Sequence, residues 1–222
     1  MSSNSSSNTV STAQLILVPA IITLAVTILR LVGELQNWPP RFFSREGGGG
    51  FALVGIWWLA PLFGIYFAIK LVHAGEGPVS SGRGILFSIL AILPVIGGMY
   101  CVFRSQFNSL AMVILGFALV AAGALIPALG WRKLFSVQFA YAFAARIPVL
   151  IVMFIAIQNN WGTHYDVAPP NFPAVGVLTK FFYIAFLPQM IMWIAYTTIT
   201  GSLFGSIAAI FAHQPNRVPQ TA

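Results

Sequence analysis

Long apolar runs, separated by short polar or glycine- and proline-rich segments, dominate the sequence. Each run has roughly 20 residues, the length that an α-helix needs to cross the hydrocarbon core of a bilayer. The runs lack the strict alternation of apolar and polar residues that is typical of transmembrane β-strands. The pattern therefore predicts an all-α, polytopic transmembrane bundle with spans at residues 13–32, 51–70, 85–103, 109–130, 134–157 and 189–212.

The last apolar stretch, residues 174–212, is too long for one untilted span, because its helix would measure about 58 Å at 1.5 Å per residue. It contains one charged residue, Lys180, and a helix-breaking proline, Pro188. We therefore expect a short interfacial or re-entrant helix over residues 174–187, followed by the sixth span. A seven-span arrangement is the alternative. Two further prolines, Pro61 and Pro94, are expected to bend their spans as Pro188 does.

The chain divides into one membrane domain with a polar tail at each end. Residues 1–12 are rich in serine and asparagine and are expected to be disordered, residues 13–213 form the transmembrane domain, and residues 214–222 form a second polar tail. No lysine or arginine precedes the first apolar run. We therefore interpret that run as a retained span rather than as a cleavable signal peptide.

The composition excludes an ordinary soluble protein. Of the 222 residues, 58% are hydrophobic and only 7% are charged, whereas soluble domains carry roughly 25% charged residues. The net charge of +7 is spread over several loops. Scattered basic residues favour contact with lipid headgroups, and they do not form the clustered basic face that nucleic-acid binding requires. The predicted partner is the lipid bilayer.

The basic loop residues also bear on orientation. Six spans place both termini on one side of the membrane, and basic residues mark the cytoplasmic side. The sequence thus predicts a protein of the plasma membrane with cytoplasmic termini, although Arg41 and Arg45 oppose this orientation. On the terminal side lie Lys70, Arg83, Arg132, Lys133 and Arg217; on the other side lie Arg41, Arg45, Arg104 and Lys180.

The most informative residue is Arg146, near the middle of the predicted 134–157 span. An arginine there costs at least about 2.5 kcal/mol to insert, so it needs a compensating partner. We predict an anion or polar-solute site at Arg146, with Glu34 as its counter-charge and Gln138 close to the same helix face. Two structural alternatives remain: a helix-locking ion pair, or a surface-lying helix that keeps Arg146 at the interface.

A stripe of small residues marks the last span. Gly201, Gly205 and Ala209 recur at intervals of four, a spacing that lets helix backbones approach closely. The stripe serves either packing within the chain, or contact with a second copy or with a partner membrane subunit. The single cysteine, Cys101, excludes an internal disulfide.

Motifs for chemistry are sparse. The chain has four acidic residues and three histidines, and no two histidines have the spacing that would place them together on one helix face, so we predict no metal site and no cofactor. No G-x-S-x-G, H-E-x-x-H or C-x-x-C motif occurs. The leading hypothesis is a small non-enzymatic carrier. The alternatives are an assembly subunit without a ligand of its own, and a membrane enzyme that uses His164 and Asp166 of the 158–173 loop.

Overall fold

The structure, a computed structural model, describes residues 10–49, 52–105, 109–170 and 172–212. The predicted tails therefore lie largely outside the described residues. Short 3-10 segments, η1 (Gly47–Gly49) and η2 (Ile126–Leu129), and two π-helical segments, η3 (Phe182–Phe186) and η4 (Pro188–Met192), accompany the α-helices. The α-helices are α1 (Thr12–Leu35), α2 (Leu59–His73), α3 (Ser81–Leu90), α4 (Ile92–Ser105), α5 (Leu110–Leu125), α6 (Arg132–Asn159), α7 (Val177–Phe181) and α8 (Trp193–Phe211).

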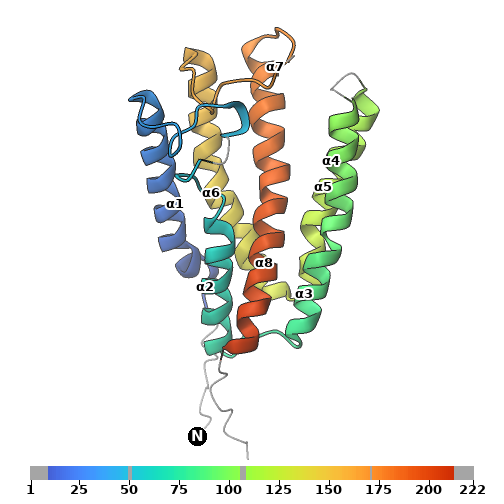
Figure 1. The fold of residues 1–222 in the computed structure, drawn as a ribbon. Coiled ribbons are helices and arrows are strands. Elements are labelled where there is room, and N and C mark those ends of the chain that lie inside the picture. Colours follow the sequence, from blue (N-terminus) through green and yellow to red (C-terminus); the bar gives the residue numbers. More distant parts are fainter. Residues whose placement is uncertain (1–9, 50–51, 106–108, 171, 213–222) are drawn as a thin grey trace, which may run out of the picture.

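The predicted helical membrane bundle is confirmed. Five helical stretches among the described residues are long and apolar enough to cross a membrane, and α2 is a shorter apolar helix. Helices suit this sequence because each one satisfies its own backbone hydrogen bonds where no water is present. Figure 1 shows that α1 begins and α8 ends at the same end of the bundle, which we call the terminal end. The opposite end carries residues 36–49 and 52–58 (the first loop) and residues 160–170 and 172–176 (the second loop).

The second helix is shorter than predicted. The expected span over residues 51–70 is wrong at its start, because α2 begins at Leu59. The backbone N–H groups of Leu53 and Val54 instead donate to carbonyls of Arg41 and Phe42 within the first loop. Pro61 therefore lies in the first turn of α2, where a proline leaves the helix intact. The first loop occupies the part of the bundle that a full-length helix would fill (Figure 1).

The last apolar stretch is also different from the prediction. Residues Val177–Phe211 form one helical stretch, so the separate re-entrant helix expected over residues 174–187 is not present. Pro188 has no N–H to donate to the preceding turn. The helix continues past it through η3 and η4, whose wider π-helical turns re-pair the backbone. By contrast, a break at Ala91, between α3 and α4, lies close to Pro94, where a bend was predicted.

The predicted small-residue stripe packs inside the chain. A Cβ atom added to Gly64 of α2 would overlap the backbone of Gly201, and one added to Gly205 would lie 2.7 Å from the carbonyl oxygen of Gly64. Ala209 is a half-buried neighbour of the same core. The backbones of α2 and α8 therefore touch near the terminal end. Contact of the stripe with another chain stays a prediction.

A similar close approach joins α4 to α5 and gives a first testable prediction. A Cβ atom at Gly98 would overlap the carbonyl oxygen of Gly116, whereas one at the adjacent Gly97 would meet only a Leu119 methyl group at 3.9 Å. We expect Gly98→Ala to lower the free energy of unfolding by about 1–3 kcal/mol. Gly97→Ala is the matched control and should be neutral or slightly stabilising. Thermal denaturation in detergent measures both, and equal melting temperatures would contradict the prediction.

Candidate functional site

A cavity of about 810 Å³ lies between the α4–α5 pair and the α6–α8 side of the bundle. The proline-rich second loop and Gly48 of the first loop contribute to its wall, so the cavity lies in the loop half of the molecule. Most of its lining is apolar and includes Met99 of α4, Phe117 of α5 and Val149 of α6. Polar groups enter from a few positions: Thr27, Arg30, Arg146, His164, Tyr165, Tyr183 and Gln189.

Arg146 lies in this cavity and is only 3% exposed. Its Nη1 donates to Oε1 of Gln189 over a long 3.5 Å, and its guanidinium carbon lies 4.6 Å from the ring centre of Trp193. The buried Nε has no hydrogen-bond partner among the described residues. Both contacts are with neutral groups, so the positive charge of Arg146 has no ion-pair partner in the part of the chain that the structure describes.

The three residues predicted to bind substrate do not converge. The proposed pairing of Glu34 with Arg146 is wrong, because the carboxylate of Glu34 contacts Arg30 and His164. Gln138 is fully buried against Gly201 at the α6–α8 contact and does not line the cavity. Of the three, Arg146 alone lines the cavity, and its role in binding a solute stays a prediction.

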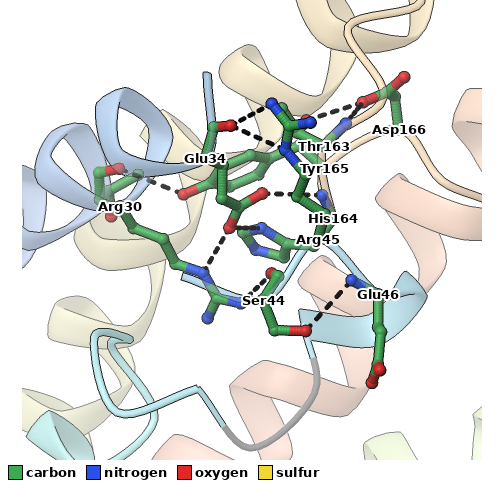
Figure 2. Close-up of polar contacts among 10 residues, drawn as sticks. Arg30, Glu34, Ser44, Arg45, Glu46, Thr163, His164, Tyr165 and Asp166 are labelled. Atoms are coloured by element: carbon green, nitrogen blue, oxygen red, sulfur yellow. Dashed lines mark hydrogen bonds and ion pairs between the residues drawn. The ribbon is translucent and has the colours of Figure 1, made fainter. Parts of the chain in front are cut away.

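Glu34 is instead the centre of a buried polar cluster at the loop end (Figure 2). Its carboxylate is 0% exposed and accepts from Nε of Arg30 at 2.8 Å. The same carboxylate accepts from the backbone N–H of His164 at 2.9 Å and lies 2.5 Å from Nδ1 of that histidine. Arg30 and Glu34 are one helical turn apart on α1, so this ion pair is local, whereas His164 comes from the second loop. Glu34 thereby attaches the second loop to the end of α1.

The first loop is attached to the same place. Arg45 donates from Nε and Nη2 to the backbone carbonyl of Glu34 in the last turn of α1, a carbonyl that also accepts from the backbone N–H of Asn37. Arg30 also donates to the carbonyl of Ser44 at 3.2 Å. Both loops that contribute to the cavity are therefore fixed to the last turns of α1 (Figure 2).

The second loop has a compact turn of its own. The Asp166 carboxylate accepts from the backbone N–H groups of Gly162 and Thr163 and from the Thr163 hydroxyl, at 2.7–2.9 Å. Asp166 thus holds its own loop, and His164 turns away from it toward Glu34 (Figure 2). The two residues that an enzyme in this loop would use are therefore both engaged in contacts that shape the loop.

Burial and the contact with Glu34 shift the pKa of His164 in opposite directions. Burial lowers the pKa of His164 below its ordinary value of 6.5, the hydrogen bond to Glu34 raises it, the charge of Arg30 lowers it again, and the net shift is downward. His164 is therefore neutral at pH 7, with Nδ1 in contact with the Glu34 carboxylate. The charges of Arg30 and Glu34 then balance within the cluster.

The lowered pKa of His164 gives a second prediction. Because the unfolded chain binds a proton at higher pH than the folded chain, the stabilising contribution is complete above about pH 6.5 and is lost as the pH falls through the folded pKa. We expect the melting temperature to drop when wild-type protein is taken from about pH 7.5 to about pH 5.5. His164→Asn removes the titrating group, so its melting temperature should fall less. If the melting temperatures of the two proteins fell equally between these two pH values, the pH dependence would not come from His164.

Fold and cavity together define a helical integral membrane protein that encloses a positively charged, largely apolar chamber. The chain is 34% identical over 124 residues to a protein of Haloquadratum walsbyi named "Putative metal transport protein". The matched region covers 53% of this chain and 55% of that relative, so the chain spans about half the length of the curated relative it matches. No family model matches the chain. No solved structure matches it either.

Proposed function

We propose that this protein is a membrane carrier, or the ligand-binding subunit of one, and that it binds an anionic solute at Arg146. The observation that carries the proposal is a permanently charged guanidinium, 3% exposed, that lines a cavity of about 810 Å³ and has a free Nε donor among the described residues. Arginine does not neutralise itself by losing a proton in proteins. A bound anion would supply the compensating charge.

The name of the relative favours a metal ion as the cargo. Among the described residues, no group of three or more His, Cys, Asp or Glu side chains is placed to hold a metal ion. The positive charge of Arg146 also opposes a bare cation in this cavity. A metal carried here would therefore be bound as an oxyanion or as an anionic chelate, which makes metal transport a special case of the same anion site.

A binding experiment tests the proposal. Purified full-length protein in nanodiscs is titrated calorimetrically with acetate, benzoate, phosphate, molybdate and nickel citrate, and with nickel chloride as the bare cation. We expect at least one anion to bind, and Arg146→Gln to weaken that binding at least tenfold, which is about 1.4 kcal/mol. Arg104→Gln changes an exposed arginine at the end of α4 and is the matched control.

Two results would overturn the proposal. If no anion binds, the protein behaves as a structural or assembly subunit without a ligand of its own. If nickel chloride alone binds and Arg146→Gln leaves its affinity unchanged, the cargo is a cation held elsewhere. Retained folding of Arg146→Gln, checked by size-exclusion chromatography, separates loss of binding from loss of structure.

We also propose a plasma-membrane location with six crossings and cytoplasmic termini. Basic residues at the terminal end support this orientation, namely Lys70, Arg83, Arg132 and Lys133. A reporter that fluoresces only in the cytoplasm, fused to the carboxyl terminus, should be bright. A dark fusion that is nevertheless inserted in the membrane would reverse the orientation.

A further inference from the structure

The cavity is much larger than a small inorganic anion requires. A water molecule occupies about 30 Å³ in the liquid, whereas pockets for drug-sized organic ligands measure about 300–1,000 Å³. The cavity of about 810 Å³ belongs to the second class. An inorganic anion at Arg146 would leave most of the apolar wall without contact to the ligand, so burial of that wall would contribute nothing to binding.

The wall itself carries several aromatic and thioether side chains. Besides Trp193, the aromatic side chains of Trp57, Phe103 and Phe117 line the cavity. Aromatic rings pack favourably edge-to-face or offset against other rings. Thioether side chains from three different segments, Met99, Met153 and Met192, line it as well, and methionine adapts its shape to a ring at little cost.

The contacts of the Arg146 guanidinium determine which of its donors a ligand can reach. The Trp193 ring lies against the guanidinium at 4.6 Å, and Gln189 accepts from Nη1. The unpartnered Nε leaves one N–H donor of the planar guanidinium for an acceptor approaching in its plane. A carboxylate is planar and suits in-plane approach to a guanidinium, which is why arginine–carboxylate pairs are geometrically specific.

From the charge of Arg146, the volume of the cavity and the side chains that line it, we infer that the ligand is an organic monoanion. It carries one carboxylate on a ring-bearing, largely apolar body. The carboxylate contacts Arg146, and the rings lie against the aromatic and methionine side chains. This inference rests on the anion site proposed above and specifies its substrate class. It excludes bare inorganic anions and small aliphatic acids as the physiological cargo.

A graded series of probes tests the inference on wild-type protein. Acetate, benzoate and naphthoate share one carboxylate and differ in apolar area, while naphthylmethanol keeps the rings and lacks the charge. We expect affinity to rise from acetate to naphthoate by at least about a hundredfold, because each added ring brings more apolar surface out of water. Naphthylmethanol should bind at least about tenfold more weakly than naphthoate, as it offers nothing to the guanidinium.

A cavity-filling variant provides the second measurement. Val149 lines the cavity from α6, one turn after Arg146, so Val149→Phe should reduce naphthoate binding at least tenfold and reduce the binding of the much smaller acetate several times less. The matched control is Val18→Phe, at a lipid-exposed position of α1. If one of these variants fails to fold, the probe series on wild-type protein still tests the ligand class.

The outcomes separate this inference from the proposed function. If acetate, phosphate or molybdate binds through Arg146 as tightly as naphthoate does, the organic class is overturned and the anion site stands. If naphthylmethanol binds as well as naphthoate, the charge does not select the ligand and both conclusions fall. If no anion binds at all, the proposed function fails first, and the inference fails with it.

Discussion

Replacing Glu34 with alanine is expected to lower the free energy of unfolding by about 3–5 kcal/mol, the cost of removing one partner of a buried ion pair. The side chain of Glu34 is 0% exposed and bonds to Arg30 and to the backbone and side chain of His164. Its loss leaves the Arg30 charge without its carboxylate and leaves a backbone N–H of the second loop without its acceptor. Thermal denaturation in detergent measures the loss, and limited proteolysis of the second loop should become faster.

The chain provides a matched control for this experiment. Glu76 also forms an ion pair, with Lys133 at 2.9 Å, but its side chain is 22% exposed and that of Lys133 is 34% exposed. Water screens such a pair, so Glu76→Ala should cost no more than about 1 kcal/mol. A loss in Glu34→Ala no larger than that in Glu76→Ala would show that the buried cluster does not hold the loops.

Replacing Arg146 with methionine is expected to stabilise the protein while abolishing anion binding. The guanidinium costs at least about 2.5 kcal/mol at the centre of a bilayer, and its contact with Trp193 returns no more than about 2 kcal/mol. Methionine has a similar length and no charge to bury. The melting temperature without ligand should therefore rise, and the titration with naphthoate should show no heat of binding.

Arg146→Lys is the control that keeps the charge. It should give no gain in melting temperature, since the cation remains buried, and it should bind anions more weakly than wild type because an ammonium lacks the planar array of donors. A fall in melting temperature in Arg146→Met would identify Arg146 as a structural residue, with its energetic compensation in the protein itself. That result would remove the main support for a ligand site.

The apolar pattern predicted most of the helices closely, and its two failures have physical reasons. Hydrophobic runs define what must leave water, but they do not define whether the backbone is helical. Residues 52–58 are apolar enough to extend a span, yet the N–H groups of Leu53 and Val54 pair within the first loop. Pro188 suggests a break in any sequence-based argument, and only the structure shows the π-helical turns that carry the helix past it.

The candidate site was predictable in part. The insertion cost of a central arginine identified Arg146 from sequence, and the structure places it in a cavity. The partner of Glu34 could not be found in the same way, because His164 lies 130 residues away and no periodic pattern links a loop residue to a helix end. The sequence argument paired Glu34 with Arg146 because a central arginine needs a counter-charge near the membrane, whereas the structure engages Glu34 with Arg30 and His164 at the loop end.

The glycine contacts between α2 and α8 also limit how these two helices can move. Where Gly64 meets Gly201, main chain lies directly against main chain with no side chain between the two glycines. A change of shape in this half of the molecule therefore requires that α2 and α8 move as one body or that these backbone contacts separate.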